Sequence, residues 1–577
     1  MRIPVLYRDD DLIAVDKPAG IPTHAPDPND PAIGDALRIV RAQEGLGYLG
    51  MHQRLDAETS GVLVFATRAE TNRALAAAFE GRSVRKVYAA LVHGAPRRKE
   101  GLVDAPIVRD RGERYRVAAA GDPRGQLART RYRVLETFAA GLARAADGSP
   151  ARGYALVEVI PETGRSHQIR IHLAHIGTPV VGDPLYGPVD QPAPRLCLHA
   201  RELTLPHPAT GRPVTFVAPL PAPLADVSHE SQALALAAAR VHIREAVRFP
   251  EGLRGLLRLA VARRAPLAAD PETAIYRLVN GEADGLPGLT VDRYGQALVA
   301  GIYEDDETTP PFPFAEALAE ALASETGTLS VYVKYHPRQA SRITEDQMTR
   351  LAPPRPIFGP HQGEVIGCEE GLLYRLRMGD GLSVGLFPDM RGGRARVRVW
   401  ATGLRVLNSF AYTCGFGVAA MAGHARRVLN VDLSKVALAW GQENYRLNDF
   451  EPDPYDFVYG DVFDWLARLA RRADLFDLVI LDPPGFSKTK SRSFNAAHDY
   501  AGLAALAARV TAKEGLLLAC CNLAELPWRA FRSRVLAGLA EAGRTAAIAG
   551  VYHEPAIDHP WPARGEPYLK MLAVRLN

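Results

Sequence analysis

The side chains that could do chemistry fall into two groups at opposite ends of the chain. In the first group, Asp56 stands between Arg54 and a glycine turn at Gly61 that feeds a strand-like run. On spacing alone, Asp56 reads as a turn residue that caps its own backbone. A later cluster, Gly164 to Arg170, favours a catalytic acid instead, because an arginine beside a carboxylate keeps it ionised and can position phosphates. That cluster contains Arg165, His167 and Arg170.

The second group lies in the C-terminal third, where polar residues follow successive strand-like runs. One run reaches a glycine turn at Gly415 and Gly417, and such glycines let a cofactor approach the backbone. Asp432 ends the next run, where a carboxylate can accept both ribose hydroxyls of a nucleoside. Asp461 and Asp482 stand at the ends of two further runs. The pattern therefore predicts a nucleoside cofactor at one edge of a parallel sheet.

Composition limits the kind of protein that carries these groups. The chain has 577 residues, enough for about three to four domains, with 47% hydrophobic and 23% charged residues. A formal net charge of +4 means that nucleic-acid binding must come from local patches. Five cysteines without a CxxC pair argue against a disulfide framework and a structural zinc site, and favour a reducing cytosol. With neither a signal sequence nor an apolar run of 18 residues, we expect a cytoplasmic protein without membrane spans.

The elements that must position the chemistry divide into four segments. Residues 1–222 carry short strand-like runs and one helix. We expect Thr67 to cap the start of this helix, with Glu70 completing a capping box, and the helix to end near Gly81. Residues 223–265 read as a helical linker whose arginines predict a solvated face rather than an RNA contact. These arginines are Arg254, Arg258, Arg263 and Arg264.

The remaining two segments differ in their pattern of strand-like and helix-length runs. Residues 266–385 predict a small α+β subdomain with turn signals after its first strand. Residues 386–577 alternate strand-like runs with helix-length segments, which indicates a doubly wound parallel sheet. The expected fold class is thus multidomain, α+β followed by α/β, and ligands of the last segment should sit at the carboxyl ends of its strands.

Four motifs in order resemble the RluA-like pseudouridine synthases over residues 1–222. They are Val15 to Ile21, His52 to Gly61, Arg85 to Ala90, and Gly164 to Tyr186 with its ending Gly-Asp-Pro-Leu-Tyr. The resemblance implies an antiparallel-sheet domain that isomerises uridine in RNA without a cofactor.

On that resemblance, Asp56 is the catalytic carboxylate, acting either by attack on C1′ or by abstracting a ribose proton. Arg170 would be its ion-pair partner, and Tyr88 would stack on the flipped uracil or accept its proton, unless Tyr88 is simply a half-buried strand aromatic. Arg54 would fill the space that the base leaves. Arg165 and His167 complete the predicted substrate-binding set.

The C-terminal half resembles class I S-adenosylmethionine methyltransferases, and its stretch from Tyr276 to Arg293 narrows this to the RlmI-like rRNA methyltransferases over residues 266–577. The resemblance implies transfer of a methyl group to carbon 5 of cytosine in large-subunit rRNA. Its cofactor, S-adenosylmethionine, would be held by the residues of the strand ends. They are Tyr412, Gly415, Gly417, Asp432, Asp461 and Asp482.

Methylation at carbon 5 of cytosine needs a thiolate that adds to carbon 6. Cys520 and Cys521 follow the strand-like run Leu516 to Ala519, and because neighbouring strand residues face opposite sides, only one should enter the site. Cys521 is our choice and Cys520 the reserve, with Asp482 holding the ring near N3. If both thiols are core residues instead, Asp482 could serve guanine methylation.

The combined hypothesis is a two-enzyme fusion that modifies RNA. We expect 23S rRNA as the substrate, with tRNA as the alternative, and we expect neither a membrane nor a metal partner. The spacing of His167, His172 and His175 does not match a zinc motif. A second hypothesis is that only one half is active and the other holds RNA.

Overall fold

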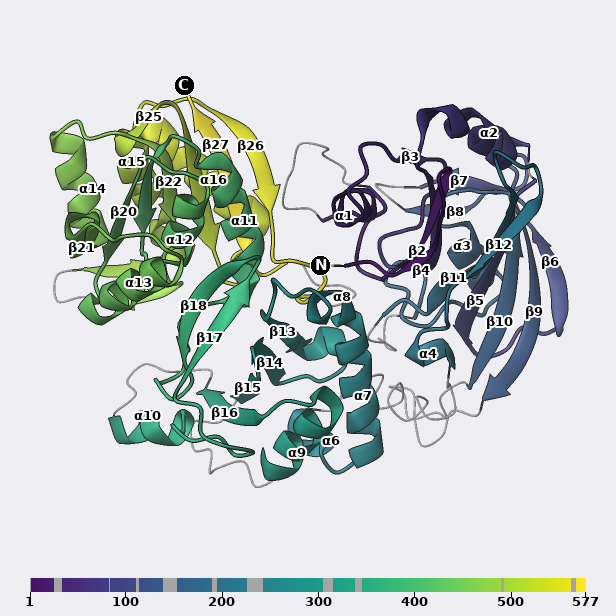
Figure 1. Cartoon of the computed structure of the whole chain (residues 1–577), viewed down its shortest axis with the longest axis horizontal. Helices are drawn as coiled ribbons and strands as arrows, with labels where there is room; N and C mark the ends of the chain where they lie inside the picture. Colours follow the sequence, from purple (N-terminus) through teal and green to yellow (C-terminus); the bar gives the residue numbers. More distant parts are fainter. Residues whose placement is uncertain are drawn as a thin grey trace.

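The computed structural model describes residues 2–24, 34–81, 83–110, 114–138, 153–188, 195–225, 242–304, 315–337, 345–488, 492–561 and 567–577. Figure 1 shows a strand-rich N-terminal body, a smaller sheet with helices in the middle of the chain, and a C-terminal sheet covered by helices. Among the described residues, no helix is long and apolar enough to cross a membrane.

The N-terminal body is built on one sheet of ten strands in the order β1-β2-β4-β11-β5-β10-β9-β6, with β12 on β11 and β3 on β4. All its pairs are antiparallel except β11 with β4. The strands are β1 (Val5–Arg8), β2 (Leu12–Lys17), β3 (Gly50–Met51), β4 (Ser60–Ala66), β5 (Arg85–His93), β6 (Glu100–Asp104), β9 (Arg129–Phe138), β10 (Tyr154–Pro161), β11 (Leu198–Pro206) and β12 (Pro213–Val217). A separate hairpin pairs β7 (Ile107–Arg109) with β8 (Tyr115–Val117).

Three helices accompany this sheet: α1 (Ala36–Gln43), α2 (Ala69–Glu80) and α3 (Gln168–His175). The expected helix after β4 is present as α2 and ends at Gly81, but the predicted capping box is wrong. Arg68 occupies the N-cap without a side-chain bond, and the Thr67 hydroxyl donates to the Asp10 carbonyl at 2.6 Å. This hydrogen bond connects the start of α2 to the turn between β1 and β2.

Short helices follow the first sheet: α4 (Ala222–Ala225), α6 (Ile243–Ala246), α7 (Pro250–Arg263) and α8 (Ala265–Ala268). Part of the predicted solvated basic face is wrong, because Arg264 is fully buried and forms a two-bond ion pair with Asp284, 2.7 Å at each contact. A further bond from Arg264 reaches the Asp558 carbonyl at 2.8 Å, so this arginine joins the middle segment to the C-terminal one.

The middle segment forms a four-stranded sheet in the order β13-β14-β15-β16, in which β15 and β16 are parallel. Its elements are β13 (Ile275–Asn280), β14 (Leu289–Tyr294), β15 (Ala297–Glu304), α9 (Ala315–Thr326), β16 (Ser330–Pro337) and α10 (Glu345–Leu351). A hairpin of β17 (Glu364–Glu369) and β18 (Leu372–Arg377) then leads towards the last sheet, as Figure 1 shows.

The C-terminal sheet has seven strands in the order β21-β20-β19-β22-β25-β27-β26. The first five are parallel, as a doubly wound sheet requires, and β27 and β26 add an antiparallel edge. The strands are β19 (Arg405–Ser409), β20 (Arg427–Asp432), β21 (Phe457–Tyr459), β22 (Phe476–Leu481), β25 (Thr511–Cys521), β26 (Ala546–Tyr552) and β27 (Lys570–Leu576). The helices are α11 (Arg391–Trp400), α12 (Gly415–Ala422), α13 (Lys435–Leu447), α14 (Val462–Arg471), α15 (Ala496–Val510) and α16 (Trp528–Glu541).

The two halves share apolar packing near the N-terminus. Ile21 of the first body and Ile557 of the C-terminal body belong to one buried cluster centred on the middle segment. A Cβ at Gly20 would lie 3.9 Å from both the Ala556 carbonyl oxygen and the Ile557 Cα. The loop before the first candidate acid therefore rests on a loop of the C-terminal half.

Candidate active sites

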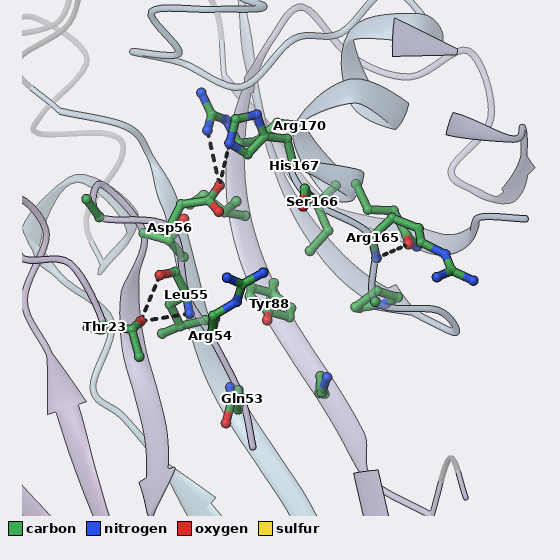
Figure 2. A pocket seen from close by; sticks show the side chains of 18 of the residues that line it. Thr23, Gln53, Arg54, Leu55, Asp56, Tyr88, Arg165, Ser166, His167 and Arg170 are labelled. Atoms are coloured by element: carbon green, nitrogen blue, oxygen red, sulfur yellow. Dashed lines mark hydrogen bonds and ion pairs between the residues drawn. The ribbon is translucent and has the colours of Figure 1, made fainter. Parts of the chain in front are cut away.

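The first candidate site is a cavity of about 650 Å³ in the N-terminal body. Its walls come mainly from residues 22–24, 52–57 and 163–170, and Tyr88 of β5 and Tyr115 of β8 also line it. Figure 2 shows Asp56, Arg54 and Tyr88 around the space, with Arg170 and His167 beside the carboxylate. The structure thus brings together segments that lie more than 100 residues apart.

Asp56 is held by Arg170, which emerges from α3. The Arg170 Nη1 lies 3.1 Å from Asp56 Oδ2, and the Asp56 side chain keeps 33% of its surface exposed to the cavity. The other face of the guanidinium binds Asp183, with Nε at 2.7 Å and Nη2 at 2.8 Å. One buried guanidinium thus bonds two carboxylates, of which Asp56 is the one that faces the accessible cavity.

Asp183 is a site residue to which the sequence analysis gave no role. Its side chain is fully buried, and its Oδ1 also accepts hydrogen bonds from the backbone N–H groups of Leu185 and Tyr186. These bonds fix the turn that carries Tyr186, whose ring centroid lies 5.2 Å from the Arg170 guanidinium carbon. Asp183 belongs to the Gly-Asp-Pro-Leu-Tyr motif, which is visible in the sequence. Its contact with Arg170 of α3 could not be predicted because the two residues are separated in the sequence.

His167 lies on the rim of the same site. Its Nε2 is 3.8 Å from Asp56 Oδ2, and its Nδ1 is 2.9 Å from the Tyr186 hydroxyl. The residue occupies the N-cap of α3 with a left-handed φ of 55°. Because such a conformation is uncommon for a residue with a side chain, the turn before α3 is held in place by its contacts.

The other predicted substrate residues face the cavity in different ways. Arg54 is exposed at the cavity, whereas the Arg165 Nε donates to the Leu127 carbonyl at 3.1 Å. Tyr88 lies on β5, where burial and the charge of Asp56 raise the pKa of its phenol. Tyr88 therefore stays protonated at neutral pH and can stack or donate, but it is a poor proton acceptor.

The loop that carries Asp56 is fixed by hydrogen bonds from Thr23 and Lys17, two residues that were not predicted as part of the site. Thr23 bonds to both backbone groups of Leu55, accepting from N–H at 3.0 Å and donating to the carbonyl at 2.8 Å. The buried Lys17 ammonium donates to the Ala57 carbonyl at 2.9 Å and to the Ile21 carbonyl at 2.7 Å. This loop is consequently rigid on both sides of the acid.

The histidines that could have suggested a metal have other partners. His172 is buried and bonds to the Thr130 hydroxyl at 2.8 Å and to the Ala105 carbonyl at 2.9 Å. Elsewhere among the described residues, Asp9, Asp11 and His207 form a group with metal-like spacing. The Asp9 carboxylate accepts from His207 and from the Asp11 N–H, both at 2.8 Å, so it connects the β1–β2 turn to the segment after β11.

The second candidate site lies at the carboxyl ends of β19, β20 and β22. The turn after β19 contains three residues with left-handed φ, namely Phe410, Tyr412 and Cys414. Asp432 at the end of β20 holds this turn, because its Oδ2 accepts from the Tyr412 N–H at 2.8 Å. Its Oδ1 accepts from the Ser434 N–H, also at 2.8 Å. Each oxygen keeps a further lone pair, so Asp432 can still bind ribose hydroxyls.

Of the predicted cofactor residues, Gly417 is better explained by packing than by cofactor approach. A Cβ at Gly417 would lie 2.5 Å from Asn430 Oδ1 and 2.6 Å from the Tyr445 hydroxyl, so this glycine lets α12 approach β20. A Cβ at Gly415 would lie 2.9 Å from Leu386 Cδ1. Asp461 is the N-cap of α14, and its Oδ1 accepts from the Phe463 N–H at 2.9 Å.

Asp482 follows β22 in an acidic setting. Burial, together with the nearby charge of Asp389, raises the pKa of its carboxyl to about 7 against the opposing charge of Arg394. Asp389 itself accepts from the Tyr568 hydroxyl at 2.7 Å, while its buried Oδ1 has no hydrogen-bond partner among the described residues. Asp389 was not predicted as a site residue, because it belongs to the turn before α11 and not to a strand end.

The adjacent cysteines point to opposite faces of the sheet, as strand geometry predicts. Both thiols are buried, Cys520 in the cluster that contains Met571 and Cys521 in the cluster on the other face. Burial raises the pKa of both thiols. For Cys521 this rise is opposed by the backbone of Leu523 and by the charge of Lys570, whereas Cys521 raises the pKa of Cys520 further. The charge of Asp482 raises the pKa of both thiols.

Comparison with known proteins divides the chain in the same way. The family of RNA pseudouridylate synthases matches residues 11–175, and the family of S-adenosylmethionine-dependent methyltransferases matches residues 361–529.

Individual relatives match one half or the other. Ribosomal RNA large subunit methyltransferase I of Aeromonas hydrophila is 35% identical over 308 residues, which cover 52% of this chain and 74% of that protein. An uncharacterised RNA pseudouridine synthase of Chloroflexus aurantiacus is 43% identical over 223 residues, 37% of this chain and 65% of that protein. A crystal structure of a putative methyltransferase complexed with SAH shares the fold, with a TM-score of 0.51, 24% identity, and coverage of 57% of this chain and 81% of that one.

Proposed function

Because this chain belongs to the pseudouridine synthases through its first domain and to the RlmI-like large-subunit rRNA methyltransferases through its second half, we propose that it performs both modifications on 23S rRNA. The substrate is taken from the names of the relatives, and tRNA is the alternative. We place both reactions in the cytoplasm.

The first reaction is isomerisation of uridine, and the ion pair between Asp56 and Arg170 at the 650 Å³ cavity is the observation that carries it. The uridine enters the cavity by leaving the RNA stack. The bond from C1′ to N1 breaks, the base rotates, and C1′ joins carbon 5, whose proton is lost while N1 gains one. Asp56 acts as an anion against the sugar, either on C1′ or on a ribose proton.

The test is mass-spectrometric mapping of rRNA from cells that lack the protein, complemented with variants. Asp56→Asn preserves the shape of the side chain and removes its charge. We expect it to abolish one pseudouridine and to leave the methyl mark intact. A pseudouridine that survives this variant, made in soluble and folded protein, contradicts the assignment.

The second reaction is methylation at carbon 5 of cytosine. When bound, S-adenosylmethionine supplies an electrophilic methyl group, and the donor set fits it. Asp432 would hold the ribose, Asp461 would lie beside the adenosine, and the unpartnered Asp389 Oδ1 suits an amino group. The turn residues Tyr412 and Gly415 would border the cofactor.

Asp482 and Cys521 would act on the cytosine ring. An acid with a pKa of about 7 can keep a proton at neutral pH and donate it to N3, an acceptor in cytosine. This draws electrons from the ring as the Cys521 sulfur adds to carbon 6 and the thiol proton passes to water. Carbon 5 then takes the methyl group. Loss of the carbon 5 proton to water re-forms the double bond to carbon 6 and expels the sulfur as thiolate, and N3 returns its proton to Asp482. The contacts of Cys521 with Leu523 and Lys570 favour it over Cys520.

Cysteine variants separate this proposal from its alternatives. We expect Cys521→Ser to abolish the methyl mark and Cys520→Ala to keep it, with the pseudouridine present in both. If the mark survives replacement of both cysteines, the cytosine mechanism is wrong and guanine becomes the candidate base, because its methylation needs no thiol. If no mark depends on the second half at all, that half only holds RNA.

A further inference from the structure

A pair of stacked rings lies at the carboxyl edge of the middle sheet. Tyr303 of β15 and His336 of β16 are directly paired in the parallel register. Their ring centroids are 4.7 Å apart and their planes differ by 13°. Tyr303 nevertheless keeps 45% of its surface exposed. A ring that is covered on one side and exposed on the other is a stacking surface for a further flat group.

The pair is fixed by its surroundings. Gly301 lies beneath it, and a Cβ there would come within 3.3 Å of the His336 ring and 2.7 Å of the Thr290 hydroxyl. The Thr290 hydroxyl also bonds to the Tyr303 side chain. Burial and the charge of Lys334 lower the pKa of His336 to about 4, so its ring is neutral at pH 7 and stacks as an aromatic group.

A short series of contacts connects the pair to the second candidate site. Lys334 lies two residues before His336 on β16 and donates to the Gly381 carbonyl. In the same loop, Ser383 bonds to the side chain of Tyr412, which belongs to the cofactor turn. Tyr303 also lies close enough to Asp389 for that charge to raise the pKa of its phenol.

A second exposed ring lies in the chain segment that follows this loop. Phe387 keeps 51% of its surface exposed, and its centroid is 5.7 Å from that of Tyr412. Two exposed aromatic rings therefore lie near Asp389, Tyr303 through space and Phe387 two residues before it in the chain. The flat groups that such surfaces recognise in a polynucleotide are unpaired bases.

We infer that Tyr303 and His336 form a stacking platform for an unpaired RNA base next to the nucleotide that is methylated. An enzyme that acts on a base must take it out of the helix, which leaves its neighbours unpaired and in need of partners. The middle sheet would supply one. This inference rests on the proposed methylation of RNA, and it assigns a substrate-binding role to a segment for which the sequence analysis predicted only a fold.

The test uses full-length protein and unmodified large-subunit rRNA, with tritiated S-adenosylmethionine. Loss of one base-stacking contact corresponds to roughly a 5- to 150-fold weaker interaction. We expect Tyr303→Ala to raise the KM for RNA by a factor in that range, with kcat and the affinity for S-adenosylmethionine unchanged. Tyr303→Phe keeps the ring and should restore the wild-type KM. Tyr455→Ala, at an 82% exposed tyrosine far along the chain, is the matched control and should have no effect.

An unchanged KM in Tyr303→Ala would overturn the inference, and so would an equal loss of cofactor affinity, which would make the ring a structural support. A second measurement does not depend on methylation. Single-stranded RNA carrying 5-iodouridine should crosslink to the peptide that contains Tyr303, and mapping crosslinks elsewhere only would refute the platform. If that crosslink forms but no RNA is methylated by the wild type, the proposed function fails while the platform stands.

Discussion

Replacing Arg170 with lysine tests whether the guanidinium is what makes Asp56 effective. In the wild type, one side chain makes three charged bonds, to Asp56 at 3.1 Å and to Asp183 at 2.7 and 2.8 Å. The lysine variant keeps the positive charge but places it on a single ammonium group, which cannot reach both carboxylates in that geometry. We expect Asp183, which is fully buried, to retain the ammonium, so that Asp56 loses its partner.

The magnitude follows from the bond that is lost. A hydrogen bond to a charged group contributes about 1.5–3 kcal/mol, which corresponds to a rate reduction of roughly 10- to 150-fold. Tritium release from RNA labelled at carbon 5 of uridine, under single-turnover conditions, measures this rate directly. The matched control is Arg131→Lys, which alters a surface pair with Glu162 and should change the rate less than about fivefold. A folded Arg170→Lys protein that reacts within threefold of the wild type would refute the argument.

Three further changes concern the C-terminal half and are read from thermal or denaturant unfolding. Burial raises the pKa of Asp482 from 3.8 to about 7, so the folded protein binds this proton more tightly than the unfolded chain does. The free energy of unfolding therefore falls as the pH rises from about 4 to about 7. The fall amounts to at most about 4 kcal/mol, and Asp482→Asn should remove it. A pH profile of stability that is the same in the variant and the wild type would contradict the raised pKa. Gly417→Ala should destabilise by about 1–3 kcal/mol through overpacking, whereas Gly502→Ala, with open space around it, should stabilise by about 0.5–1 kcal/mol. Glu369→Ala should cost about 3–5 kcal/mol by leaving a buried arginine unpaired, while the exposed Glu364→Ala should cost under about 1 kcal/mol.

The strand-end acids could be predicted from sequence because each lies at or just after the end of its own strand. Asp432 ends β20, Asp461 follows β21 and Gly460, and Asp482 directly follows β22, and parallel strands bring their carboxyl ends to one edge. The alternation of Cys520 and Cys521 between faces follows from the same local rule.

Contacts over long sequence distances could not be predicted in this way. Asp183 supports Arg170 across the turn after α3, and Arg264 finds Asp284 twenty residues downstream, so neither partner shows in a local pattern. The periodicity of α7 predicts which residues share a face, but it cannot say whether another segment covers that face. Gly417 shows a similar limit, since a glycine that admits a cofactor and one that admits a neighbouring strand look the same in sequence.

The shared cluster of Ile21 and Ile557 has a practical consequence for anyone who wishes to handle the two enzymes separately. A polypeptide cut near residue 222 would release a front piece whose loop beside Asp56 has lost its support, because Gly20 rests on Ala556 and Ile557. The rear piece would present a bare isoleucine to water. The kinetics of the separate pieces are therefore expected to differ from those of the intact chain.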